Sequence, residues 1–248
     1  CSMECIVKIE NLTKSFGDLK VLKKVSLEVY PGETVVILGS SGSGKSVLLQ
    51  ILVGLLPADS GRIWLHGYEV THFRKERDWY PVRLKTGFLF QIGGLYDSMT
   101  IFENIAFAMR YHLHLPEKEI KKRVQKILAS VQLEGIEEKY PAELSGGMQK
   151  RVGLARAIAL NPPLILYDEP TTGLDPIMGD SISRLIRHLQ RTYNISAIVV
   201  THDLSCAFKV ADRIMLLYDG KIMISGPVEE VKKSDNPYFK QFLKAIKE

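Results

Sequence analysis

Residues 34–46 read Thr-Val-Val-Ile-Leu-Gly-Ser-Ser-Gly-Ser-Gly-Lys-Ser, a strand-like run that passes into a loop of glycine and serine. The β-branched residues of Thr34–Leu38 predict a strand buried on both faces of a parallel sheet. The residues that follow match the phosphate-binding loop of nucleotide-binding proteins at every fixed position: Gly39, Ser40, Ser41, Gly42, Ser43, Gly44, Lys45 and Ser46. The glycines let backbone amides turn inward toward phosphate, and a following helix would direct its positive dipole end there. This stretch therefore predicts an α/β fold built around a triphosphate site.

Individual side chains of this loop can be assigned to the triphosphate and its metal ion. Lys45 is placed to reach the β- and γ-phosphates of ATP, and the Ser46 hydroxyl is placed to bind Mg²⁺. Val47 follows directly and is counted with the nucleotide-binding residues. A helix is expected over Val47–Leu56, with Pro57 ending it. The predicted ligands are thus ATP and Mg²⁺.

Two acidic residues end an apolar run further along the chain. Leu164–Tyr167 predicts a strand, and Asp168 and Glu169 follow it directly. Open α/β sheets bind ligands at the carboxyl ends of their strands, so these carboxylates are expected near the phosphates. Asp168 then suits Mg²⁺, which prefers oxygen ligands, and Glu169 suits activation of the attacking water. The alternative is a polar strand end, or a helix N-cap, with no catalytic role.

The composition limits the class of protein. The chain has 248 residues, of which 46% are hydrophobic and 25% charged, as is ordinary for one globular domain. Its formal charge of +5 is spread along the chain, so we expect a solvated surface and no nucleic-acid partner. The three cysteines lack metal-ligand spacing, which favours a reducing cytoplasmic compartment and argues against a zinc site. Neither a membrane span nor a secretion signal is visible.

The rest of the chain alternates between strand and helix patterns, which predicts a mostly parallel sheet with helices on both faces. Apolar residues on one helical face indicate that residues 100–141 are mainly helical: Ile120, Val124, Ile127, Leu128 and Val131. Further strands are expected at Cys5–Ile9, Val25–Val29, Gly61–Leu65, Thr86–Phe90 and Ser196–Val200. Helices are expected at Gly147–Ala159 and Pro176–Arg191, a hairpin at Asp219 and Gly220, and two short helices after Pro227.

A second glycine motif connects the chain to a known family. Leu144, Ser145, Gly146 and Gly147 precede a predicted helix, and together with the phosphate loop they resemble the signature of ATP-binding cassette (ABC) ATPases. The resemblance implies that Ser145, Gly146 and Gly147 bind the γ-phosphate of ATP held by a second subunit. A homodimer in the ATP-bound state follows from this. The alternative is that Ser145 only caps the helix.

The other motifs of the family occur in the family's order. Gln91 matches the glutamine that approaches Mg²⁺ and the attacking water, and His202 matches the histidine that contacts the γ-phosphate. Asp175 matches the loop that crosses the dimer interface and is also a good helix N-cap before Pro176. Phe16 stands where the family stacks an aromatic ring on adenine, although it could equally belong to the core.

The resemblance covers essentially the whole chain and implies its architecture. It predicts a RecA-like P-loop NTPase core, an N-terminal antiparallel β subdomain and an inserted α-helical subdomain. Residues 1–248 would form one nucleotide-binding domain. Residues 1–91 and 158–248 would contain the core and the β subdomain, and residues 92–157 the helical subdomain with the signature.

Finer features resemble the ATPases of Mla-type lipid transport systems. These features are residues 89–105, Val47 after the phosphate loop, Met148 after the signature, and the tail over residues 234–246. The resemblance implies integral membrane permease subunits, an MCE-domain protein and accessory subunits as partners. It also implies a peripheral position on the cytoplasmic face of the inner membrane. An amino-acid or metal importer, or a soluble iron–sulfur assembly ATPase, are the alternatives.

Overall fold

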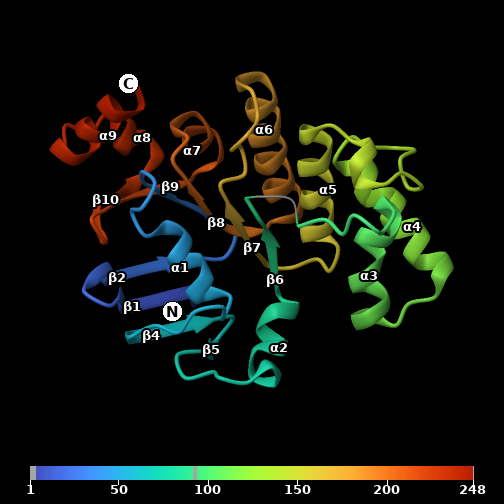
Figure 1. The fold of residues 1–248 in the computed structure, drawn as a ribbon, viewed down its shortest axis with the longest axis horizontal. Coiled ribbons are helices and arrows are strands. Elements are labelled where there is room, and N and C mark those ends of the chain that lie inside the picture. The colour runs from blue at the N-terminus through green and yellow to red at the C-terminus, as the bar shows by residue number, and fades with distance from the viewer. Residues whose placement is uncertain (1–3, 92–93, 248) are drawn as a thin grey trace.

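The computed structural model describes residues 4–91 and 94–247. Its central sheet has six strands, in the spatial order β10 (Lys221–Pro227), β9 (Arg213–Tyr218), β3 (Thr34–Leu38), β8 (Ser196–Thr201), β7 (Leu164–Asp168) and β6 (Thr86–Leu89). Figure 1 shows this sheet passing through the middle of the molecule. All neighbouring pairs are parallel except β10 with β9, which form the hairpin expected at Asp219 and Gly220.

Strand β3 lies inside this sheet and is buried on both faces, as its β-branched sequence predicts. All five of its residues are buried. Val35 and Ile37 point into one hydrophobic core, whereas Val36 and Leu38 point into the other. Hydrogen-bond ladders to β8 and β9 hold both edges of the strand. The phosphate loop therefore starts from a strand that is packed on both faces and hydrogen-bonded along both edges.

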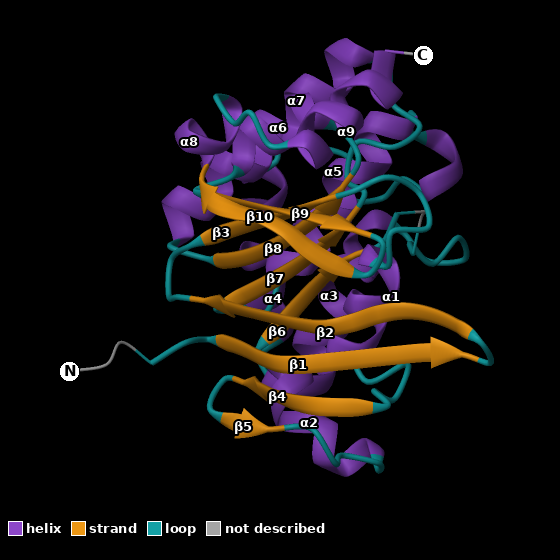
Figure 2. Cartoon of the chain, turned by 90° about the vertical axis from the view of Figure 1, so that its left-hand side faces the viewer, coloured by secondary structure: helices purple, strands orange, loops and turns teal. Residues whose placement is uncertain are grey.

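A second, antiparallel sheet forms the N-terminal part of the fold. Its strands lie in the order β2 (Leu19–Val29), β1 (Val7–Phe16), β4 (Ser60–Leu65) and β5 (Tyr68–Glu69). Figure 2 shows this sheet stacked below the central one. Helix α1 (Lys45–Leu52) shares a hydrophobic core with both sheets through Leu48, Leu49, Ile51 and Leu52. Strands β1 and β2 are longer than expected because their pairing continues through irregular register as far as Phe16 and Leu19.

The other face of the central sheet is covered by helices α5 (Gly146–Ile158), α6 (Pro176–Tyr193) and α7 (Leu204–Val210). Helices α3 (Ile101–Leu113) and α4 (Glu117–Ser130) lie beyond α5 at one end of the molecule (Figure 1). The expected apolar face of α4 is confirmed, since Ile120, Val124 and Leu128 are buried. The remaining helical segments are α2 (Glu76–Leu84), the 3₁₀ turn η1 (Pro141–Glu143), α8 (Val228–Lys232) and α9 (Pro237–Lys247).

Helix α1 ends at Leu52, four residues earlier than expected. The reason is Gly54, whose φ of 79° lies in the left-handed region that ends helices. A Cβ on this glycine would lie 2.5 Å from Trp79 of α2, so the close contact with α2 also requires glycine here. Pro57 lies beyond this turn and does not end the helix.

The expected α/β fold class is confirmed: a largely parallel sheet, an antiparallel sheet and a group of helices inserted between β6 and β7. Among the described residues, no helix combines the length and apolarity that a membrane crossing requires. Cys5 and Cys206 are free thiols, and Cys1 lies outside the described residues. No group of three metal-ligating acids, histidines or cysteines occurs in the described part of the chain.

Candidate nucleotide site

The phosphate loop connects β3 to α1, in the structural context that its sequence predicts. The Gly39 amide donates to the Thr201 carbonyl at 3.2 Å, which joins the start of the loop to β8. Gly44 has a φ of 103° and lies against β2, where a Cβ would approach Leu22 and the Val21 carbonyl to 2.9 Å. Glycine is therefore required at this position for both backbone conformation and space.

Lys45 extends from the first turn of α1 and is only 5% exposed. Its ammonium group lies 3.0 Å from Oε1 of Glu169 and donates to the Ser40 carbonyl at 3.3 Å. The lysine and the glutamate are far apart in sequence, and they meet because β3 and β7 both flank β8. Lys45, which is predicted to bind the phosphates, is thus paired with Glu169, which is predicted to activate the attacking water.

Glu169 follows the last residue of β7 and has a left-handed φ of 46°. Its backbone amide donates to the Val200 carbonyl of β8 at 2.9 Å, which fixes this unusual conformation. Nδ1 of His202 lies 3.0 Å from Glu169 Oε1, a contact that requires a proton on Nδ1. The His202 amide also donates to Oε2 at 3.3 Å. The structure therefore brings Lys45, Glu169 and His202 together around one carboxylate.

The two neighbouring carboxyl groups have opposite pKa shifts. Burial raises the pKa of Glu169, but the hydrogen bond from His202 and the charge of Lys45 outweigh burial, and the net pKa is lowered. Burial and the charge of Glu169 raise the pKa of Asp168, against the opposing effect of Lys45. Glu169 is thus held as a carboxylate, whereas Asp168 has an environment that disfavours its charge until a cation arrives.

The surroundings of Asp168 fit a magnesium ion. Among the described residues its Oδ1 atom is buried without a hydrogen-bond partner, and the Ser46 hydroxyl lies close enough to stabilise the carboxylate. Ser43 Oγ, inside the phosphate loop, is likewise buried without a partner. Unpartnered buried oxygen atoms are costly, and a divalent cation with its waters and phosphate oxygens would satisfy them. Asp168 and Ser46 are therefore the residues that could hold Mg²⁺.

The signature residues lie apart from this group, at the start of α5. Ser145 caps the helix by accepting from the Met148 amide at 3.3 Å. Asp175 caps α6 in the same way, accepting from the Ile177 and Met178 amides. Side chains on either side of Asp175 lie beside the signature, with Leu174 near Gly146 and Met178 of α6 against Gly147. Ser145 and Asp175 therefore do cap their helices. A role for either residue toward the nucleotide of another subunit stays a prediction.

Phe16, Gln91 and Val47 complete the predicted set. Phe16 is 45% exposed at the end of β1, which excludes the core alternative, and the Lys14 ammonium lies 5.2 Å from its ring centre. Gln91 follows β6, and its carbonyl accepts a hydrogen bond from Lys150 at 2.6 Å. Val47 is half-buried and packs against the core around α1. Their roles toward ATP remain predictions.

Sequence reasoning missed Lys150 and Asp203. Asp203 accepts from the Thr171 hydroxyl at 2.7 Å and caps α7, so it fixes the segment that carries His202. The signal for Asp203 was its position one residue before a short helix. Lys150 gave no signal, since it follows the signature by three residues on a helix whose orientation only the fold determines.

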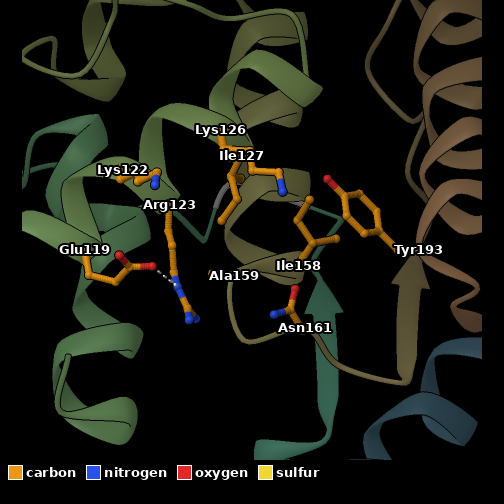
Figure 3. A pocket seen from close by; sticks show the side chains of 9 residues that line it. All are labelled: Glu119, Lys122, Arg123, Lys126, Ile127, Ile158, Ala159, Asn161 and Tyr193. Carbon is orange, nitrogen blue, oxygen red and sulfur yellow. Dashed lines mark hydrogen bonds and ion pairs between the residues drawn. The ribbon is translucent and has the colours of Figure 1, made fainter.

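A separate hollow of about 410 Å³ lies between α4 and the ends of α5 and α6 (Figure 3). Its walls combine basic side chains of α4 with Asn161 and Tyr193, and Arg123 is paired there with Glu119. None of the residues predicted for ATP or Mg²⁺ lines it. This hollow is therefore distinct from the candidate site.

Comparison with known protein families agrees with this geometry. Residues 22–172 match the family model described as ABC transporter. The chain is 40% identical over 241 residues to a probable ribonucleotide transport ATP-binding protein, mkl, of Mycobacterium leprae, covering 97% of this chain and 69% of that protein. It is 41% identical to the sulfate/thiosulfate import ATP-binding protein CysA of Methylococcus capsulatus, covering 96% and 68%. It is 39% identical to the intermembrane phospholipid transport system ATP-binding protein MlaF of Haemophilus influenzae, covering 96% and 90%.

Solved structures give the same family. The ATP-binding cassette MJ0796, solved as a dimer in a post-hydrolysis state bound to ADP and Pi, is 34% identical with a TM-score of 0.81, covering 90% of this chain and 98% of that one. CbiO1 of Clostridium perfringens, part of the ABC transporter complex cbiONQ, is 30% identical with a TM-score of 0.85, covering 97% and 95%. The chain spans about two thirds of mkl and CysA. It belongs to the ABC transporter family and is one of that family's ATP-binding domains, which hydrolyse ATP with Mg²⁺.

Proposed function

We propose that this chain hydrolyses ATP to drive a separate membrane permease that moves phospholipid. The observation that carries the ATPase part is the grouping of Lys45, Glu169 and His202, with both neighbours 3.0 Å from the Glu169 carboxylate. The group lies at the carboxyl ends of β3, β7 and β8, the edge where α/β sheets bind ligands. The phosphate loop reaches the same edge.

Each of these residues has a distinct part in the proposed reaction. ATP places its phosphates in the loop, and Lys45 leaves Glu169 to pair with the β- and γ-phosphates. Glu169 is then free to accept the proton of a water molecule that attacks the γ-phosphorus atom, while the bond to ADP breaks. Because His202 directs Nδ1 at Glu169, Nε2 is the nitrogen that faces the γ-phosphate, and it must carry a hydrogen to donate to a phosphate oxygen. Asp168, Ser46 and Gln91 would hold Mg²⁺, which would supply positive charge to the phosphate oxygens.

We also propose a homodimer that encloses ATP. In it, Ser145, Gly146 and Gly147 of one subunit complete the phosphate site of the other, and Asp175 lies at the interface. Ser145 and Gly146 are exposed at the N-terminus of α5, where amides and helix dipole favour an anion. The dimeric MJ0796 structure supports this arrangement. Phe16 would stack on the adenine with its exposed ring.

The proposed division of the chain has the bounds that the resemblance to ABC ATPases implies. Residues 92–157 would form the helical subdomain, and residues 1–91 with 158–248 the core and the β subdomain. In support, α3, α4 and α5 contact one another and come between β6 and β7 along the chain. Residues 92 and 93 at this boundary lie outside the described residues.

Phospholipid as the cargo rests on the similarity to MlaF and on the resemblance of residues 89–105 to Mla-type ATPases. The proposal places the chain on the cytoplasmic face of the inner membrane, with permease subunits, an MCE-domain protein and accessory subunits as partners. The chain has similar sequence identities to CysA and mkl, so the test must distinguish phospholipid transport from sulfate and ribonucleotide transport.

The test is to express the gene with its chromosomal neighbours and to purify the complex through this chain. We expect a permease with several membrane spans to co-purify. In liposomes, the complex should move a fluorescent phospholipid at the expense of ATP, and a Glu169→Gln complex should not. Transport of sulfate or a ribonucleotide without phospholipid would contradict phospholipid as the cargo but not the transport function. Recovery of only a soluble scaffold partner would contradict the transport function.

A further inference from the structure

Helix α5 packs very closely against β6, the edge strand that leads to Gln91. A Cβ on Gly153 would lie 2.7 Å from the Leu89 side chain, and a Cβ on Gly87 would lie 2.5 Å from the Ala157 carbonyl. The two elements can approach this far only because each contributes a glycine. Lys150 precedes Gly153 by three residues and so lies on the same face of the helix. The close packing therefore brings Lys150 to the end of β6.

Lys150 makes defined contacts there. Its ammonium donates to the Gln91 carbonyl at 2.6 Å and lies 3.4 Å from the Phe90 carbonyl. Both carbonyls lie beyond Leu89, the last residue of β6, where the ladder to β7 has ended. The lysine thus satisfies main-chain acceptors that strand pairing leaves open.

The charge of Lys150 also affects Asp168, the carboxylate predicted to hold Mg²⁺. Lys150 is half-buried, which lowers its pKa, while the carboxylate of Asp168 acts in the opposite direction. In return, Lys150 is one of the cations that lower the pKa of Asp168 against its burial. The ammonium that contacts the Gln91 main chain thus also favours the charged form of the carboxylate predicted to hold Mg²⁺.

The same helix holds the chain again after the two residues that are not described. Arg156 donates to the Gly94 carbonyl, and its guanidinium lies 5.8 Å from the centre of the Tyr96 ring. Asn104 of α3 accepts from the Tyr96 amide at 2.8 Å. The chain is thus held by helices both at Gln91 and at Gly94 and Tyr96. Two residues of the helix that begins at the signature, Lys150 and Arg156, make contacts on both sides.

We propose that Lys150 is a positioning residue that holds the Gln91 main chain at the metal and water end of the nucleotide site. This inference rests on the proposed role of Gln91. Because α5 also carries Ser145 at its start, Lys150 makes the position of Gln91 depend on the position of the signature. Movement of the signature helix toward a partner's ATP would then move Gln91 within its own site.

The test compares three variants of the full chain. Lys150→Met keeps the apolar stem and removes the ammonium, Lys150→Arg keeps a cation that can reach both carbonyls, and Lys118→Met removes an exposed lysine of α4 as the matched control. We expect Lys150→Met to lower kcat about tenfold while KM for ATP stays within about twofold, since Lys150 orients Gln91 but does not touch phosphate. Lys150→Arg should recover most of kcat, and Lys118→Met should match the unmodified chain.

A second readout does not depend on turnover. Amide hydrogen exchange over residues 86–91, without nucleotide, should be faster in Lys150→Met than in Lys118→Met, because an anchor of this segment is lost. Unchanged exchange there, or a kcat equal to that of the control, would overturn the inference. Equal loss of kcat and melting temperature in Lys150→Met and Lys150→Arg would reduce Lys150 to a structural residue. If the unmodified chain hydrolyses no ATP, the proposed function fails, and the exchange comparison still decides the role of Lys150.

Discussion

Replacement of Glu169 by glutamine separates nucleotide binding from turnover in one substitution. The change keeps the size of the side chain and an oxygen that can accept from Lys45 or His202, but it removes the negative charge. Turnover should fall because an amide cannot take the proton of the attacking water. General bases contribute about 10²–10⁴-fold to a rate, and we expect a loss in this range.

Binding should change in the opposite direction, and the structure gives the magnitude. Lys45 Nζ and Glu169 Oε1 are 3.0 Å apart, and both side chains are 6% exposed. Two unit charges at that distance attract by about 5 kcal/mol at an effective dielectric constant of about 20. Desolvation opposes much of this attraction, so the net value is about 1–3 kcal/mol. ATP must replace this pair to recruit Lys45, so Glu169→Gln should tighten ATP binding by about 5–150-fold.

The assay is isothermal titration of ATP into both proteins, together with phosphate release at saturating ATP. Glu33→Gln is the matched control, because it removes a half-buried carboxylate whose Oε1 lies 2.8 Å from Arg213 at the opposite end of β3. This control should reduce stability and leave ATP affinity unchanged. Wild-type affinity in Glu169→Gln would refute the competition between Glu169 and phosphate for Lys45. Normal turnover would exclude Glu169 as the group that activates water.

Other substitutions test neighbouring parts of the argument. Lys45→Ala should weaken ATP binding by about 100-fold or more, since it removes a charged donor to phosphate, and titration at wild-type affinity would exclude Lys45 from the cradle. Ser145→Arg should stop turnover while the monomer still binds ATP, and wild-type phosphate release would contradict the shared site. Asp168 has a raised pKa, so its contribution to stability falls as pH rises through that pKa. The Asp168→Asn variant should therefore have a higher melting temperature than wild type at pH 7, by about 2–4 °C for each kcal/mol gained. At a pH where Asp168 is already protonated, the variant should melt no higher than wild type. Gly87→Ala should lower the free energy of unfolding by about 1–3 kcal/mol in a denaturant titration, because its Cβ would meet the Ala157 carbonyl at 2.5 Å; an unchanged midpoint would show that α5 can move away from β6.

Local sequence determined the central strands and the phosphate loop well. Strand β3 has the bounds that its β-branched run predicts, and β7 and β8 each extend one residue beyond the expected end. These segments are buried on both faces, so composition alone distinguishes them from helices. Helix α2 was missed because Pro81 lies inside it, and α7 because it has only seven residues.

The contacts within the site were less accessible to sequence reasoning. Lys45 and Glu169 were assigned to the same reaction, but their ion pair depends on strand order and on the left-handed backbone of Glu169. The contact of Lys150 with Gln91 depends on two glycine contacts between α5 and β6. Such tertiary relations have no periodicity along the chain, and only the folded arrangement shows them.

The ring of Phe16 has a consequence for the choice of nucleotide. With the Lys14 ammonium 5.2 Å from its centre, the ring has a cation on one face, which leaves the opposite face for a base. A phenyl ring has no hydrogen-bonding group, and every base presents a π surface to it. Its contribution to affinity should therefore be nearly equal for adenine and guanine. A preference for ATP over GTP would have to arise from other groups or from the relative abundance of the two nucleotides in the cell.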